Sequence, residues 1–292
     1  PDAVLNPGAT TTFEVVVEIP ADARADEQGP TITPVIESKR SLMEIQGEPY
    51  SGLTVESVND LSLTLVDAPT KLRPGQPNEL QWTITNHGNG AANARLMMLD
   101  VPADWSWWIA FEGSNTTDPV PLGASFDENH EQQVSLYLSI PLSVPAGSIH
   151  TVNVHVMTSG NEPDATPENN AVEVVMSTEA IRVPSLELVD HSTTAMAGGT
   201  ISAQAVVRND GNAPESTLLS VGRVSSTPPL PGMVVFYSVE GADQPLATPT
   251  PLLIPAGGEQ RLQLEVLIPA DAQLNTRFVF EFEILGVVDD EG

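Results

Sequence analysis

The chain repeats itself at an interval as long as a whole domain. Residues 63–67 read LTLVD, and residues 186–190, which lie 123 positions later, read LELVD. The segment Asn-His-Gly-Asn at 86–89 recurs at the same offset as Asn-Asp-Gly-Asn at 209–212. A repeat of this length is a domain rather than one turn of a solenoid. The sequence therefore predicts a tandem array of similar domains.

A third copy shows only its later half. Residues 13–20 (FEVVVEIP) match residues 134–141 (VSLYLSIP) and residues 262–269 (LQLEVLIP). Apolar and polar residues alternate in each segment, which is typical of a half-buried antiparallel strand, and the proline ends the strand because it cannot donate to a ladder. The strand before Asn86 alternates in the same way, with Leu80, Trp82 and Ile84 predicted to face the core.

These matches predict three domains. Residues 1–60 form the C-terminal half of an immunoglobulin-like repeat, residues 61–183 a complete repeat, and residues 184–292 a repeat that lacks its last strand. Each full repeat yields roughly seven to eight strands with turn residues between them, and no segment has sustained helical periodicity. The predicted fold is all-β, with tandem immunoglobulin-like antiparallel β-sandwiches. We expect the chain to be a segment of a longer polypeptide, whose open halves are completed either by residues outside this segment or by a neighbouring protomer.

Charge excludes several classes of function. The chain has 39 acidic and 11 basic residues and a net charge of −28. Nucleic acid and anionic membrane surfaces are not expected partners, because both require a basic surface. The acidic surface is explained either by solvation in salty water or by a cation such as Ca²⁺ bound between domains. No cysteine is present, so disulfides and thiolate sites are excluded, and no apolar run is long enough to insert into a membrane.

The order of motifs resembles a known family. The motifs are Pro-Gly-Gln at 74–76, an alternating strand, Thr-Asn-His-Gly-Asn-Gly at 85–90, Val-Pro-Ala-Asp-Trp at 101–105 and Pro-Glu-Asn-Asn at 167–170. Together they resemble the CARDB-like immunoglobulin-like repeats of bacterial and archaeal surface proteins, and the related β-sandwich found beside the catalytic domains of some α-galactosidases. The resemblance implies an extracellular sandwich in a large surface or secreted protein, although fold-level analogy does not fix function.

Two tryptophans are candidate ligand-binding residues. Trp105, Trp107 and Trp108 lie within four positions. Trp107 and Trp108 are typical either of a platform on which a sugar ring stacks or of packing at a domain edge, since tryptophan is common in both settings.

One loop is a candidate metal site, and another is a candidate glycosylation site. Glu162, Asp164, Glu168 and Asn169 supply oxygen ligands of the kind that Ca²⁺ prefers, with Asn170 next to them. The same asparagines could instead shape the turn into the next strand. Asn115 begins an Asn-Thr-Thr sequon.

No motif in the sequence indicates catalysis or a required cofactor, and Ca²⁺ is the one candidate ion. The sequence therefore predicts a non-enzymatic structural or adhesive repeat segment of a cell-surface protein, such as a surface layer, sheath, filament or adhesin stalk. The alternative is a carbohydrate- or protein-binding accessory module of a secreted enzyme. Expected partners are neighbouring domains of the same protein, other copies of the chain, or a glycan, and the expected location is extracellular.

Overall fold

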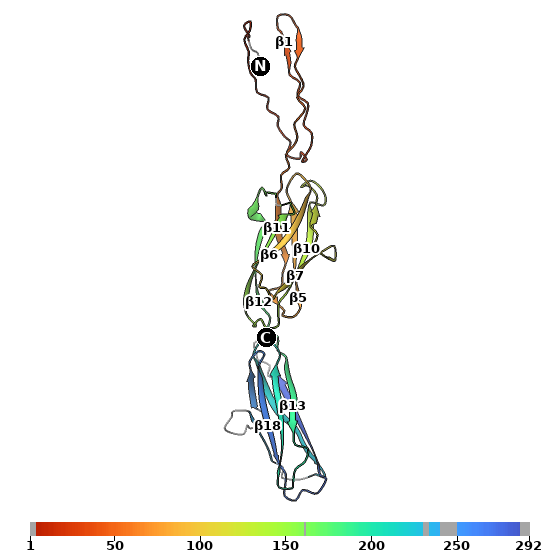
Figure 1. Cartoon of the computed structure of the whole chain (residues 1–292), viewed down its shortest axis with the longest axis vertical. Helices are drawn as coiled ribbons and strands as arrows, with labels where there is room; N and C mark the ends of the chain where they lie inside the picture. Colours follow the sequence, from red (N-terminus) through yellow and green to blue (C-terminus); the bar gives the residue numbers. More distant parts are fainter. Residues whose placement is uncertain (1–3, 161, 230–233, 240–249, 287–292) are drawn as a thin grey trace.

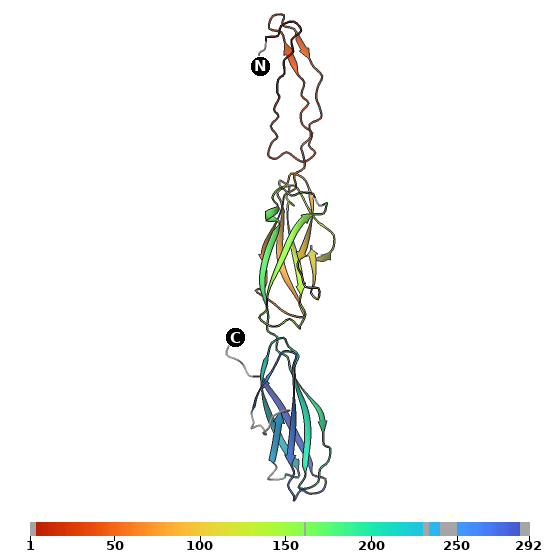
Figure 2. The same cartoon turned by 60° about the vertical axis from the view of Figure 1, so that its left-hand side comes forward.

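The chain is built of three units placed end to end. The computed structural model describes residues 4–160, 162–229, 234–239 and 250–286. Figures 1 and 2 show an N-terminal hairpin-like unit at one end, a central sandwich, and a C-terminal sandwich at the other end. We call them the N-terminal unit (residues 4–60), the central unit (61–183) and the C-terminal unit (184–286).

The central unit is a sandwich of two five-stranded sheets. The strand order of the first sheet is β3 (Leu61–Asp67), β5 (Pro77–Asn86), β10 (Glu131–Ser139), β7 (Ser106–Phe111) and β8 (Ser114–Thr116). The strand order of the second sheet is β4 (Lys71–Leu72), β12 (Ala171–Thr178), β11 (Ile149–Thr158), β6 (Ala92–Leu99) and β9 (Val120–Leu122). All pairings are antiparallel except that of β4 with β12.

The C-terminal unit repeats this arrangement, with fewer strands among its described residues. Its first sheet has the order β13 (Pro184–His191), β14 (Thr200–Asn209), β18 (Glu259–Leu267) and β16 (Val234–Val239). Its second sheet has the order β17 (Thr250–Ile254), β15 (Glu215–Thr227) and β19 (Arg277–Gly286). Residues 287–292, which the predicted third repeat includes, lie outside the described residues.

Corresponding strands of the two sandwiches pair in the same register. Leu63 pairs with Ile84 in the central unit, and Leu186, 123 positions later, pairs with Val207. Both first strands then carry a β-bulge at the same place, between Leu65 and Asp67 and between Leu188 and Asp190. The bulge turns Val66 and Val189 outward, and the two valines are 52% and 53% exposed.

The predicted alternation fills both cores. Leu80, Trp82 and Ile84 of β5 are fully buried, and so are the inward residues Leu136 and Leu138 of β10. The corresponding strand β14 buries smaller residues, which are Ile201, Ala203, Ala205 and Val207. Most of the buried residues in both cores are aliphatic.

The N-terminal unit differs from the prediction. It contains a short hairpin of β1 (Val35–Glu37) and β2 (Glu44–Gln46), extended by two isolated bridges. The predicted strand at residues 13–19 is extended chain without ladder pairing, and its apolar residues are 39–78% exposed. The prediction of a half-buried strand there is wrong, because no described second layer covers the residues that face inward in the other two copies.

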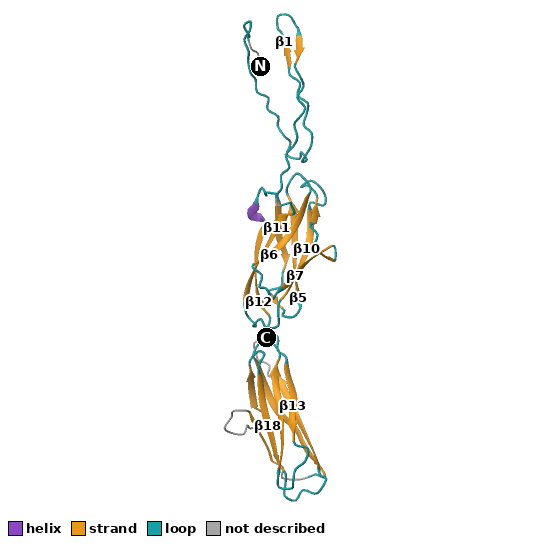
Figure 3. Cartoon of the chain, viewed as in Figure 1, coloured by secondary structure: helices purple, strands orange, loops and turns teal. Residues whose placement is uncertain are grey.

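Helix is nearly absent, as predicted. Figure 3 shows a single short helical segment, the 3₁₀ turn η1 (Pro167–Asn169), among the described residues. No described helix is long and apolar enough to cross a membrane. The fold is all-β, with immunoglobulin-like antiparallel sandwiches in tandem.

Candidate functional site

The two junctions between units share one construction, which begins with a buried asparagine. Asn86 is 1% exposed and its Nδ2 donates to the backbone carbonyls of Gly90 and Gly123, at 2.8 and 2.7 Å. Its Oδ1 accepts from the N–H of Gly88 at 2.9 Å. Asn209 makes the corresponding set, in which Nδ2 donates to Ala213 and Oδ1 accepts from Gly211 at 3.0 Å. Each asparagine fixes the turn that receives the preceding linker.

A glycine in each turn lets the linker backbone approach closely. A Cβ atom at Gly88 would lie 2.2 Å from the carbonyl oxygen of Val58, and one at Gly211 would lie 2.1 Å from that of Ile181. Both distances are far below van der Waals contact. Glycine is therefore required by the close approach of another backbone segment.

The second asparagine of each turn binds the linker directly. Oδ1 of Asn89 accepts from the N–H of Val58 at 2.8 Å, and its Nδ2 donates to the carbonyl of Glu56 at 3.0 Å. Asn212 does the same with Ile181, at 2.6 Å, and Glu179, at 2.9 Å. Each amide side chain takes the place of a strand partner for the linker, which leaves the linker little freedom.

The preceding unit contacts the same asparagine through a loop that follows its Ile-Pro step. The N–H of Ala25 donates to the backbone carbonyl of Asn89 at 3.0 Å, and the N–H of Ala146 donates to that of Asn212 at 3.1 Å. Nδ2 of Asn212 also donates to the carbonyl of Val144, at 3.0 Å. We call each set of turn, linker and loop a joint. One asparagine in each joint contacts the two units and the linker between them.

The first joint adds an exposed ion pair, whereas the pair in the second joint, Arg182 with Glu215 at 3.5 Å, has a buried carboxylate. Arg24 of the N-terminal unit donates to the carboxylate of Asp127 in the central unit at 2.8 Å, and its guanidinium lies 4.3 Å from the centroid of the Phe126 ring. The hydrogen bond lowers the pKa of the Asp127 carboxyl and raises the pKa of Arg24. Both groups are at the surface, so salt screens this contact more than the buried amide bonds.

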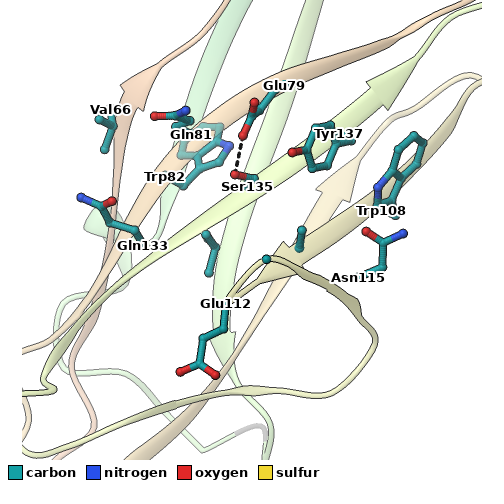
Figure 4. Close-up of a pocket in the computed structure, with 13 residues that line it drawn as sticks. Val66, Glu79, Gln81, Trp82, Trp108, Glu112, Asn115, Gln133, Ser135 and Tyr137 are labelled. Carbon is teal, nitrogen blue, oxygen red and sulfur yellow. Dashed lines mark hydrogen bonds between the residues drawn. The ribbon is translucent and has the colours of Figure 1, made fainter.

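The aromatic face of the central unit lies away from the joints. Trp108 of β7 and Tyr137 of β10 are cross-strand neighbours whose rings stack with centroids 5.4 Å apart and an interplanar angle of 15°. They line a shallow depression of about 560 Å³ on the outer surface of the first sheet (Figure 4). Polar side chains surround the pair, and Ser135 donates to Glu79 at 2.6 Å. The other polar lining residues are Gln81, Glu112, Asn115 and Gln133.

The structure separates the three clustered tryptophans. Trp107 precedes Trp108 on β7, so its side chain leaves the opposite face of the sheet, and it is 37% exposed. Trp105 packs against the core and meets the ring of His150 edge-on at 4.9 Å. Of the two candidate ligand residues, Trp108 lines the depression.

The acidic loop binds its own backbone. Oδ2 of Asp164 accepts from the N–H of Leu61 at 2.8 Å, and Oδ1 accepts from that of Thr166 at 2.9 Å. Glu162 accepts from Nδ2 of Asn59 at 3.1 Å, whereas Glu168 and Asn169 lie in η1. Throughout the part of the chain that the structure describes, no three histidine or carboxylate side chains are placed to hold a metal ion. The loop therefore joins the start of the central unit to its end, and Ca²⁺ binding by its residues stays a prediction.

Asn115 lies on β8, directly after the Glu112–Gly113 turn, and its side chain is exposed. It borders the depression that Trp108 lines (Figure 4). Glycosylation at this position stays a prediction.

Comparisons with known proteins identify no family. No family model matches the chain, and no curated protein matches it. Among solved structures, it is similar to a chain of one described as "Chaperone-tip adhesin complex is vital for synergistic activation of CFA/I fimbriae biogenesis", at 13% identity and a TM-score of 0.29. The match covers 93% of this chain and 78% of that chain. A likeness at this level supports no conclusion about fold or function.

Proposed function

We propose that this chain is a rigid spacer, a structural segment of a large extracellular or cell-surface protein, with no enzymatic activity of its own. The observation that carries the proposal is the repetition of the joint, in which Asn89 and Asn212 hold corresponding linkers in the same way. A sandwich domain can fold without such a contact to its neighbour. A joint built twice from the same bonds favours a role in which the angle between domains is fixed.

The acidic surface and the resemblance to CARDB-like repeats support this proposal. A net charge of −28 keeps neighbouring rods apart in solution through mutual repulsion. Such a segment suits a stalk, sheath or surface layer that holds a binding or catalytic domain away from its attachment point.

Small-angle X-ray scattering of the intact chain tests the rigidity of the rod. We expect a profile that fits one elongated shape with its units in line. The double variant Asn89→Ala/Asn212→Ala should show a broader distribution of shapes and a shorter mean maximum dimension, because both linkers lose their side-chain partners. Asn93→Ala, which changes an exposed asparagine on β6, should match the wild type. A wild-type profile that requires many inter-domain angles would contradict the proposal.

A second candidate function is weak binding of a neutral glycan by the face around Trp108. Stacked aromatic rings beside carboxamide, hydroxyl and carboxylate groups form a mixed apolar and polar surface of the kind that orients small ligands. The carboxylates of Glu79 and Glu112 disfavour an anionic sugar by charge repulsion. This function matches an accessory module that presents carbohydrate to an enzyme elsewhere in the same protein.

Saturation-transfer NMR with cellotriose and chitotriose tests the second candidate. Trp108→Ala should abolish transfer to the sugar ring protons, whereas Trp107→Ala, on the opposite face of the same strand, should retain it. Equal signals from the two variants, or none from the wild type, would exclude glycan binding at this face for these sugars.

A further inference from the structure

The N-terminal unit matches the later half of the central unit in its backbone. The carbonyl of Pro20 accepts from the N–H of Ala23 at 3.1 Å, and that of Pro141 accepts from Val144 at 3.2 Å. Six positions after each proline, the backbone is left-handed, with φ of 62° at Asp26 and 74° at Gly147.

The pairing that follows this loop is also the same. The isolated bridge between Gln28 and Thr54 corresponds to the pair Ile149 and Ser177, where β11 meets β12. The N-terminal unit therefore contains equivalents of β10, β11 and β12. Its equivalent of β10 is the extended segment at residues 10–18.

The complete repeat shows what the N-terminal unit lacks. In the central unit, β10 lies between β5 and β7, and its inward residues, from Val134 to Ile140, are at most 3% exposed. The corresponding residues of the N-terminal unit are between 39% and 63% exposed, namely Phe13, Val15, Val17 and Ile19. No strand among the described residues pairs with this segment. The backbone donors and the apolar face that form a core elsewhere are both open here.

The uncovered apolar face of the N-terminal unit contains a depression. Phe13, Val15 and Val17 line a depression of about 560 Å³ together with residues from the hairpin. The hairpin residues are Ile32, Thr33, Pro34, Glu48, Tyr50 and Leu53. Removing such an apolar surface from water is favourable, and an unpaired strand edge invites another strand.

We propose that this face binds the front half of another repeat of the same class, contributed by the same polypeptide immediately ahead of residue 10. The strand equivalent to β5 pairs antiparallel with residues 10–18. The complete repeat sets the register: Val134 pairs with Trp82 and Leu136 with Leu80, so the equivalents of Trp82 and Leu80 lie opposite Phe13 and Val15. In the central unit, only residues 123–130 separate β9 from β10. A front half that ends a similar distance before residue 10 would therefore be joined to the N-terminal unit by a short loop of the same polypeptide.

A second copy of the chain is a poorer occupant. Its strand β5 already lies between β3 and β10, and its strand β14 lies between β13 and β18. Within the described residues, a second copy has no free front half to donate without opening one of its own sandwiches.

The proposal is tested by a fusion in which a second copy of residues 61–130 replaces residues 1–9 and is joined directly to residue 10, with the rest of the chain unchanged. Tyr137 pairs with Glu79 on the outer face of the central unit, and Val16 corresponds to Tyr137. Because the chain has no cysteine, Val16→Cys combined with Glu79→Cys in the fused copy reports this register by disulfide formation. We expect rapid cross-linking. We also expect hydrogen exchange of the amides at 11–19 to slow by about 100-fold or more, as paired strands acquire protection.

The matched control moves one cysteine by four residues. Val16→Cys with Thr83→Cys in the fused copy separates the two sites by about 13 Å, at 3.3 Å per residue, which no disulfide spans. Equal cross-linking of both pairs would overturn the proposed register.

A second fusion places a copy of residues 184–258 ahead of residue 10, so that β14 takes the role of β5. It tests the proposal independently if the first fusion does not fold. Unchanged exchange at 11–19 in both fusions would overturn the proposal. The unfused chain should sediment as a monomer at all concentrations. Protection of residues 11–19 that grows with its concentration would assign the face to a second copy instead.

Discussion

Oδ1 of Asn212 accepts a hydrogen bond of 2.6 Å from the backbone N–H of Ile181, and Nδ2 of the same side chain donates to the carbonyls of Glu179 and Val144. Asn212 is 4% exposed, so its bonds are shielded from water. One amide thereby holds the linker and the end of the central unit against the C-terminal unit. An amide is required here, since the site needs an acceptor and two donors on one planar group.

Asn212→Asp should destabilise the second joint. The carboxylate would keep the bond from Ile181 but would face two carbonyl oxygens without a proton to donate. We expect a loss of about 1–3 kcal/mol in the unfolding free energy, which is the usual penalty for buried groups left unpaired. Chemical denaturation measures the loss. The control Asn93→Asp should change stability by less than about 0.5 kcal/mol, because it alters an exposed position.

Gly211→Ala should force the linker away from its turn, because the new Cβ would lie 2.1 Å from the carbonyl oxygen of Ile181. The expected destabilisation is about 1–3 kcal/mol, as for other overpacked sites. Gly88→Ala should act in the same way at the first joint. Gly52→Ala is the control, because its Cβ would meet only ordinary contacts at 3.6 Å or more. Thermal unfolding that is equal for all three variants would contradict the close approach.

Salt should loosen the first joint more than the second. The ion pair of Arg24 with Asp127 is exposed, and the screening length falls from about 10 Å at 0.1 M salt to about 3 Å at 1 M. The second joint has an ion pair of Arg182 with Glu215 at 3.5 Å, but the Glu215 side chain is only 7% exposed, so salt screens this pair less, and the bonds of a buried amide hold the rest of the joint. Spin labels at Glu44→Cys and Asn93→Cys span the first joint, and labels at Asn93→Cys and Leu274→Cys span the second. The first distance distribution should broaden in 1 M NaCl, and the second should not.

The central unit should lose stability in mild acid through His150. Partial burial lowers the pKa of His150, whose Nε2 lies 2.8 Å from Oγ1 of Thr178. A histidine with a lowered folded pKa binds its proton more readily when unfolded, so its destabilising effect grows as pH falls below about 6.5, the ordinary histidine pKa. The melting temperature should therefore drop between pH 7.5 and 5.5. His150→Gln should flatten this dependence, and an unchanged slope would assign the effect to other groups.

Trp82→Phe should change the unfolding free energy of the central unit only slightly, although the side chain is large and buried. Nε1 of Trp82 is buried and has no acceptor among the described residues, so phenylalanine removes no hydrogen bond. We expect a loss below about 1.5 kcal/mol, whereas Trp82→Ala should lose about 3–5 kcal/mol by opening a cavity. A large loss for Trp82→Phe in chemical denaturation would indicate an acceptor for the indole N–H.

The alternation of apolar and polar residues along short segments was enough to predict the sandwiches. The alternation in β5, β10, β14 and β18 assigned the inward face of each strand correctly, because one face of each must leave water. The offset between copies also aligned the bulged strands β3 and β13. The same pattern was wrong at residues 13–19, since periodicity identifies the face that would be buried and not whether a partner covers it.

The joints were harder to predict. The sequence identified both Asn-x-Gly turns, but local signals do not distinguish an asparagine that shapes its own turn from one that binds a linker 31 residues away, as Asn89 and Asn212 both do. Arg24 and Asp127 are separated by 103 positions and carry no motif. A recurrence of both asparagines at the repeat offset was the one available signal. In the aromatic cluster, strand alternation could have separated Trp107 from Trp108 had the strand been located first.

The parallel pairing of β4 with β12 has a mechanical consequence. β4 follows the strand that enters the central unit from one linker, and β12 leads into the other linker. Because the two strands are parallel, tension applied at the two linkers slides one past the other. The bonds from Ser177 to Thr70 and from Glu179 to Leu72 lie across that direction, so they share the force and must break together. Under pulling, the rate of forced unfolding governs how long such a unit survives, and this geometry makes the central unit resist shear rather than unzip one bond at a time.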